Sequence, residues 1–189
     1  MTFDFSALPS TTRVGSASLS ITLYHSFPDD IRLALESPGG TVVMLMANAG
    51  SDLDIVNTTL VFSEFGSTLS NDGQITSGTY LAGQAFNADI LLGAPAPQGP
   101  YAMTMEAFRG ETAAGTWRVW AYDDASADTG LITTASLQLQ TETFPNPRLT
   151  PPPTTSTQPF IRLRLVDPGR ISSHSVNWRV TNGSAFYDA

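Results

Sequence analysis

Aspartate residues gather at three places in the chain where a hard cation could bind. The three groups are Asp123, Asp124 and Asp128; Asp29 and Asp30; and Asp52 and Asp54. Crowded carboxylates repel one another unless they are solvated, hydrogen-bonded or bridged by a cation, and Ca²⁺ takes oxygen ligands. None of the groups has the EF-hand pattern, and aspartate is also common in β-turns for backbone reasons alone. Calcium is therefore the candidate cofactor, with Asp123, Asp124 and Asp128 as its preferred ligands.

Residues that could act as the base or as a thiol nucleophile in acyl transfer are scarce. The chain has two histidines, His25 and His174, and no cysteine. A serine protease needs a hydroxyl nucleophile, a histidine base and an orienting acid, and the segments that carry them in subtilisin-like enzymes are missing. Asp128-Thr129-Gly130 matches a protease segment in letters, but aspartate and glycine are favoured in turns. We expect no catalytic residue in this chain, and we expect His25 to satisfy nearby backbone or carboxylate groups.

Three aromatic residues, Tyr101, Trp120 and Tyr122, are a candidate surface for stacking against a sugar. On a strand, Trp120 and Tyr122 point to the face opposite Trp117. The alternative is that they pack on the sheet or against a neighbouring domain, as aromatic residues of a sandwich commonly do.

Composition excludes several classes of partner. The chain has 189 residues, a net charge of −8, nine arginines and no lysine. An acidic chain is a poor match to the phosphate backbone, so nucleic acid is not expected as a partner. No apolar run approaches the roughly 20 residues of a membrane-spanning helix. The first residues lack the basic start and apolar stretch of a signal peptide, so any export signal is expected outside this sequence.

Apolar residues recur with a period of two, which predicts strands. Leu19, Ile21 and Leu23 alternate with polar residues, and Ile31, Leu33 and Leu35 alternate with Arg32, Ala34 and Glu36. Each segment should therefore have one face exposed to solvent. The Ser-Pro-Gly-Gly turn at 37–40 should lead into a central strand over 41–47, whose sequence TVVMLMA is apolar on both faces. Further strands are expected around Leu60, Phe62 and Phe65, and then as a last pair over 116–122 and 131–139.

These strands, with turns between them and no capped helical stretch, predict an all-β fold. We expect an antiparallel two-sheet sandwich, jelly-roll-like, of about eight strands. In the last strand, Leu131, Thr133, Ala135, Leu137 and Leu139 should share one face.

The chain changes character near residue 144. Residues 1–143 carry four arginines against fifteen acidic residues, a charge of −11, whereas residues 144–189 carry +3. The stretch FPNPRLTPPPTTSTQP over 144–159 is typical of a proline-rich linker. We therefore predict a β-sandwich domain over 1–143, a linker over 144–159, and a hairpin-like segment over 160–189 with strands at 160–166 and 175–181. That segment is the candidate start of another module, and the alternative is that its strands dock on the first domain.

Three segments, in order, make residues 8–141 resemble the P domain, also called homo B domain, that follows the catalytic domain of proprotein-convertase-type serine proteases. The first is ITLYHSFPDDIRLALESPGGT over 21–41, and the second is TSGTY over 76–80. The third runs from FRG at 108–110 through GTW at 115–117, the aspartates at 123–124 and DTG at 128–130 to Leu137. Two features depart from the pattern of that family: the loop over 92–100 is enlarged, and the tryptophan that usually precedes Ser136-Leu137 is absent.

The resemblance implies a non-catalytic domain that packs beside a subtilisin-like catalytic domain and stabilises it. The expected partner is thus an adjacent catalytic or other domain of the same secreted or cell-surface polypeptide. The alternative is a binding or adhesion module of a modular surface protein without protease activity.

Overall fold

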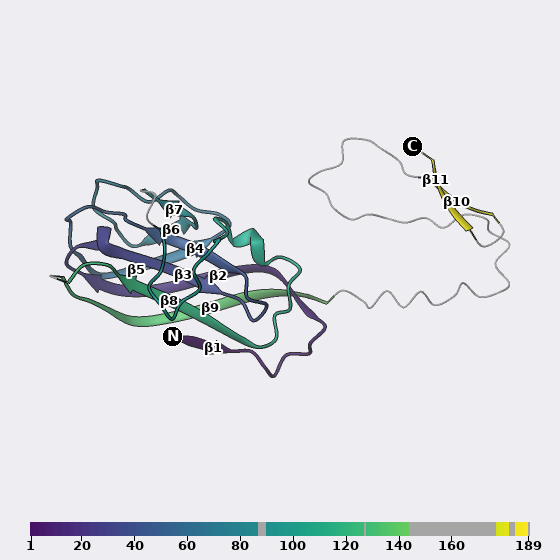
Figure 1. Cartoon of the computed structure of the whole chain (residues 1–189), viewed down its shortest axis with the longest axis horizontal. Coiled ribbons are helices and arrows are strands. Elements are labelled where there is room, and N and C mark those ends of the chain that lie inside the picture. The colour runs from purple at the N-terminus through teal and green to yellow at the C-terminus, as the bar shows by residue number, and fades with distance from the viewer. Residues whose placement is uncertain (87–89, 127, 144–176, 182–183, 189) are drawn as a thin grey trace. The chain divides into compact units, whose positions relative to one another are not determined.

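The computed structural model describes residues 1–86, 90–126, 128–143, 177–181 and 184–188 (Figure 1). The chain divides into two compact units, residues 1–146 and 147–189, and each is described by itself. The predicted linker at 144–159 and the predicted strand at 160–166 lie outside the described residues. The proposed domain boundaries therefore stay a prediction.

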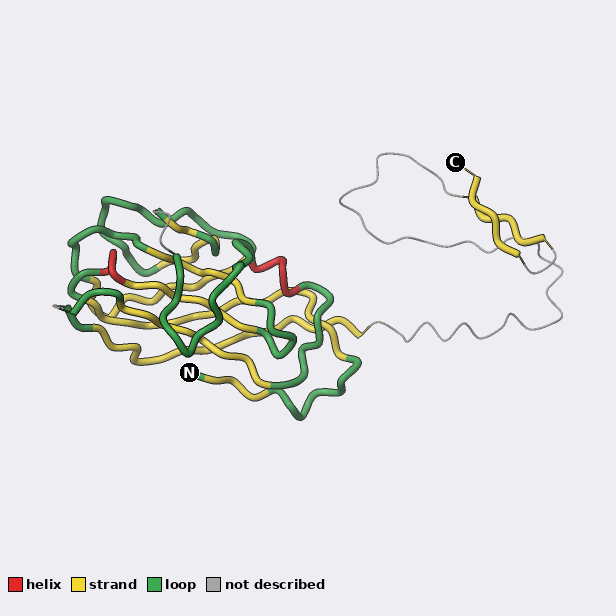
Figure 2. The backbone as a smooth tube through the Cα atoms, viewed as in Figure 1, coloured by secondary structure: helices red, strands yellow, loops and turns green. Residues whose placement is uncertain are grey.

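The first unit is a sandwich of two sheets (Figures 1 and 2). The five-stranded sheet has the order β1-β8-β3-β4-β7, and the four-stranded sheet has the order β6-β5-β2-β9. The strands are β1 (Thr2–Asp4), β2 (Thr12–His25), β3 (Ile31–Glu36), β4 (Val42–Ala47), β5 (Ile55–Ser63), β6 (Gly78–Leu81), β7 (Gln84–Ala85), β8 (Thr116–Asp123) and β9 (Gly130–Thr143). Two 3₁₀ helices, η1 (Pro28–Asp30) and η2 (Met105–Phe108), interrupt the connections.

The predicted all-β two-sheet sandwich is confirmed, and the described part of the first unit has nine strands where about eight were expected. Most pairs are antiparallel, but β4 pairs with β7 and β5 with β6 in parallel, so both sheets are mixed. The predicted turn at 37–40 joins β3 to β4 as an antiparallel hairpin. β4 is buried along its whole length, as its apolar sequence requires.

The space between the sheets is filled by the residues whose alternation predicted the strands. Leu19, Ile21 and Leu23 of β2 are buried, and Trp117 of β8 is fully buried against Phe108, with ring centroids 4.9 Å apart and an edge-on geometry. The indole N–H of Trp117 donates to the carbonyl of Ala113 at 3.1 Å, so the buried polar atom is satisfied.

The prediction that one face of β3 is exposed to solvent was wrong. Arg32 and Ala34, which alternate with the core residues, are themselves buried. A loop over 90–102 covers this face: its residues Leu92 and Ala96 form a second apolar cluster with Ala34 and with residues of β4. Its end is fixed by backbone hydrogen bonds between Ala102 and β4. The alternation of polar and apolar residues along β3 reflects only local polarity. It cannot show that a loop distant in sequence folds over the strand.

The prediction that 116–122 and 131–139 form a strand pair was also wrong. β8 pairs with β1 and β3, whereas β9 pairs with β2 in the other sheet. The connection from Asp123 to Gly130 therefore crosses from one layer to the other. A register shift opposite Thr22 and Leu23 also divides β9, so that Ile132 packs on the core while Leu131 is 62% exposed. The predicted common face holds only for Ala135, Leu137 and Leu139.

Phe65, expected on a strand with Leu60 and Phe62, lies beyond the end of β5 and is 80% exposed.

In the second unit, β10 (Asn177–Thr181) pairs with β11 (Ser184–Asp188) as an antiparallel hairpin, which confirms strand structure over 177–181. Across the described ranges, no helix has the length and apolar character needed to cross a membrane.

Candidate functional site at the end of the sandwich

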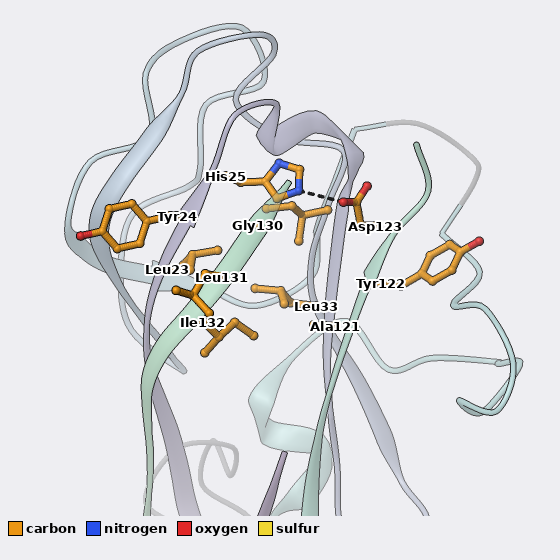
Figure 3. Close-up of a pocket in the computed structure, with 11 residues that line it drawn as sticks. Leu23, Tyr24, His25, Leu33, Ala121, Tyr122, Asp123, Gly130, Leu131 and Ile132 are labelled. Carbon is orange, nitrogen blue, oxygen red and sulfur yellow. Dashed lines mark hydrogen bonds and ion pairs between the residues drawn. The ribbon is translucent and has the colours of Figure 1, made fainter. Parts of the chain in front are cut away.

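A hydrogen bond between His25 and Asp123 joins the two sheets at one end of the sandwich (Figure 3). His25 is the last residue of β2, and Asp123 is the last residue of β8. The imidazole Nδ1 accepts the backbone N–H of Phe27 at 3.1 Å, so the ring proton resides on Nε2. Nε2 then donates to Asp123 Oδ2 at 3.1 Å. The expectation that His25 satisfies backbone and carboxylate groups is confirmed.

Gly130 determines where the His25 ring can lie. The two residues face each other across β2 and β9. A Cβ atom at position 130 would lie 2.3 Å from the Cδ2 atom of His25, which is closer than any real contact. The imidazole therefore occupies the space that a side chain at position 130 would need.

Below this hydrogen bond lies a pocket of about 250 Å³ between the sheets (Figure 3). Its lining is mostly apolar and comes from both layers: Leu23, Ile31, Leu33, Ala121, Leu131 and Ile132, among others. His25, Asp123 and Gly130 also line it. The volume is below the range of about 300–1,000 Å³ that is usual for small-molecule sites.

The carboxylates at this end of the sandwich repel one another. Burial raises the pKa of Asp30, and the charges of Asp124, Asp128, Asp123 and Asp29 raise it further, in that order. The backbone N–H of Asp124 also donates to the carbonyl of Asp30 at 3.1 Å. Two of the three predicted acidic groups, far apart in sequence, therefore come together at this end of the sandwich.

The three predicted calcium ligands each have a different protein partner. Asp123 accepts from His25, and Asp124 forms an ion pair with the buried Arg32. Asp128 Oδ1 accepts from the hydroxyl of Ser26 at 3.0 Å. Within the residues that the structure describes, no group of three or more acidic or histidine side chains is placed to hold a metal ion.

Calcium at Asp123, Asp124 and Asp128 stays a prediction. Thermal unfolding with calcium and with a chelator tests it directly, because a ligand that binds only the folded state raises the melting temperature. The third acidic group, Asp52 and Asp54, lies exposed in the loop before β5.

The candidate sugar-stacking residues pack on the second apolar cluster. Tyr101, Trp120 and Tyr122 are all partly buried against it. The Tyr101 hydroxyl donates to Pro97 O at 2.6 Å, and the Trp120 indole donates to Glu36 Oε2 at 2.8 Å. This arrangement favours the alternative interpretation, sheet packing, over a free stacking face.

Sequence reasoning missed the role of Arg32. Its guanidinium donates to the carbonyl of Leu91 at 2.7 Å, pairs with Asp124, and lies 5.5 Å from the ring centre of Tyr122. It thus connects the covering loop to the acidic end of the sandwich. An arginine in an otherwise apolar strand was the available signal, since a buried charge is retained only where it is paired.

The remaining histidine, His174, lies outside the described residues. Comparison with protein-family models, with curated proteins and with solved structures finds no significant match to this chain.

Proposed function

We propose that this chain is a non-catalytic accessory domain of a larger secreted or cell-surface subtilisin-like serine endopeptidase, which it stabilises by packing beside the catalytic domain. The observation that carries the proposal is that residues of the P-domain-like segments contact one another in the folded domain. His25 of the first segment bonds to Asp123 of the third. Phe108 and Trp117, both of the third, pack edge to face.

A further contact joins the first and third segments. A Cβ atom at Gly115 would lie 2.8 Å from the Cβ of Pro38, and Gly115 has a φ of +122°. Thr41, at the end of the first segment, donates its hydroxyl to Glu111. The resemblance therefore rests on residues that hold the sandwich together, as expected for a shared fold.

The chemistry of His25 supports a non-catalytic role. A histidine base needs one ring nitrogen free to accept the proton of a nucleophile. Here Nδ1 accepts from Phe27 and Nε2 donates to Asp123, and the ring is buried. Neither nitrogen is available to activate a serine or a water molecule.

Exposed apolar side chains supply surface for a neighbouring domain. Phe65, Val56 and Leu131 are 80%, 66% and 62% exposed. Large apolar side chains at such exposure gain free energy when a partner covers them, at about 25 cal/mol per Å².

An immunoblot of secreted and surface fractions, beside a casein zymogram, tests the proposal. Antibody raised against this chain should detect a band much larger than 20.1 kDa that coincides with casein cleavage sensitive to serine-protease inhibitors. A large band without such activity would favour the adhesion module instead. A band near 20.1 kDa would contradict the proposal of a larger parent protein.

A further inference from the structure

We propose that a second pocket, at the ends of β5 and β6, binds the side chain of a lysine from a partner polypeptide, and that the carboxylate of Glu64 receives its ammonium group. The proposal does not depend on whether a protease domain is attached. It assigns a site for a primary alkylammonium group.

The second pocket lies where β5 and β6 end beside η2, and its volume is about 300 Å³. It shares no lining residue with the pocket of Figure 3. Leu81, Ala82 and Met105 supply apolar lining, and Glu64 and Glu106 supply two carboxylates. A lysine side chain matches this combination, because it has an apolar stem and a charged end.

Glu64 is a buried acid with one of its two carboxylate oxygens unpaired. Its side chain is only 9% exposed, and Oε2 accepts a hydrogen bond from the guanidinium of Arg109 at 2.9 Å. Oε1 is shielded from solvent, and no described residue donates a hydrogen bond to it. A buried carboxylate oxygen without a donor is unfavourable. Because a carboxylate turns readily about the last bond of its side chain, Oε1 can be presented to a donor in the pocket that Glu64 lines.

The charges around the second pocket favour one additional cation. Glu64 and Glu106 both line it, and among the described residues Arg109 is the basic side chain that forms an ion pair with one of them. Two negative charges and one positive charge leave a net charge of −1. A ligand with a single positive charge balances it. Phe65, which is exposed and also lines the pocket, adds an aromatic ring that attracts a cation.

The ion pair of Arg109 favours lysine over arginine as the ligand. An arginine binds a carboxylate best through two parallel hydrogen bonds, which need both oxygens of that carboxylate. Oε2 of Glu64 is already bonded to Arg109. An ammonium group is compact, carries three donors and can use Oε1 alone. The chain has no lysine, so the ligand comes from outside these 189 residues.

Titration of the full chain, followed by NMR of the backbone amides, tests the proposal. The probe is a lysine blocked at both ends, as its acetyl and methylamide derivative. We expect saturable binding with a dissociation constant on the order of 1–10 mM. The amide shifts should be concentrated at residues 63–65, 81–82 and 104–106.

Three related compounds define what the pocket recognises. Blocked arginine should bind about threefold to tenfold more weakly than blocked lysine. Blocked norleucine, which has the stem without the ammonium group, should not bind measurably. Free butylamine should bind no more tightly than blocked lysine, because the expected ligand is part of a polypeptide.

Removal of the Glu64 charge should abolish most of the binding. Glu64→Gln should weaken the binding of blocked lysine by about tenfold or more. Glu36→Gln is the matched control, because Glu36 is also mostly buried and paired with an arginine but does not line the second pocket. We expect it to leave the affinity unchanged.

Removal of Arg109 should change the specificity of the pocket. Arg109→Gln frees Oε2 of Glu64 and removes a positive charge, so blocked lysine should bind about twofold to fivefold more tightly. Blocked arginine should gain more, because both oxygens become available to it, and the preference for lysine should fall to within about twofold. Arg118→Gln, which removes a similarly exposed arginine from another glutamate, should alter neither affinity.

Circular dichroism and the unfolding midpoint establish that each variant is folded, and the Arg109→Gln series decides if Glu64→Gln is not. Absence of saturable binding by blocked lysine, equal binding of blocked norleucine, or an unchanged preference for lysine in folded Arg109→Gln would each overturn the proposal. Butylamine binding about tenfold more tightly than blocked lysine would overturn the assignment of a polypeptide ligand.

Discussion

A side chain at position 130 should destabilise the domain through the His25 ring. In Gly130→Ala the new methyl group would lie 2.3 Å from His25 Cδ2, so the imidazole must move. Its hydrogen bond to the Phe27 N–H is worth about 1 kcal/mol, and its bond to the Asp123 carboxylate about 1.5–3 kcal/mol. Loss of both gives an expected decrease of about 2–4 kcal/mol in the free energy of unfolding.

A double-mutant cycle separates this contact from a general effect of the glycine. His25→Ala removes the same two hydrogen bonds and should cost a similar free energy, but it also removes the ring that the methyl group meets. The double variant should therefore be about as stable as His25→Ala alone, so the coupling energy should equal the whole Gly130→Ala effect, about 2–4 kcal/mol in magnitude. Gly39→Ala is a control, because a Cβ there would lie no closer than 3.4 Å to any atom, and we expect a change within about 0.5 kcal/mol.

Urea unfolding followed by tryptophan fluorescence measures the wild type and the four variants, since Trp117 is fully buried in the folded state. If the two single substitutions add to within about 0.5 kcal/mol in the double variant, then position 130 does not act through the imidazole and the reasoning fails.

Three further predictions concern the core, the covering loop and pH. Trp117→Ala should lower the free energy of unfolding by about 3–5 kcal/mol in urea melts, because the indole is fully buried; a loss below about 1 kcal/mol would contradict its place in the core. Arg32→Met should lower the free energy of unfolding by about 2–4 kcal/mol, because it leaves the partly buried Asp124 without its ion pair. It should also accelerate amide hydrogen exchange across residues 90–102, because the hydrogen bond to Leu91 is lost. Unchanged exchange there would show that the arginine does not hold the loop. Asp30→Asn should raise the free energy of unfolding at neutral pH, because the pKa of Asp30 is raised in the folded state. The stability of the wild type therefore falls as the pH rises through that pKa. Below the ordinary aspartate pKa of 3.8 the carboxyl is protonated in both states, and the advantage of the variant should vanish. Urea midpoints from about pH 3 to pH 7 measure this difference, and a variant less stable than wild type at neutral pH would refute the stated cause.

The sequence alone was enough to predict the fold class. A period of two places Leu19, Ile21 and Leu23 on one face of any strand, wherever that strand lies, and the turn at 37–40 acts through its own backbone preferences. Local rules of this kind need no knowledge of distant residues. The same holds for the buried strand β4, whose sequence is apolar on both faces.

The tertiary structure decided what each face meets. Arg32 is buried because residues 90–102 fold over β3, and β8 lies in a different sheet from β9 because the connection after Asp123 crosses between layers. The candidate pocket has the same origin: it exists only where β8 and β9 approach from opposite sheets, and where Gly130 leaves room for the His25 ring. Such contacts join residues far apart in the sequence, 59 positions for Arg32 and Leu91 and 98 for His25 and Asp123. Their partners are selected by packing and by the pairing of buried charges, which no local pattern encodes.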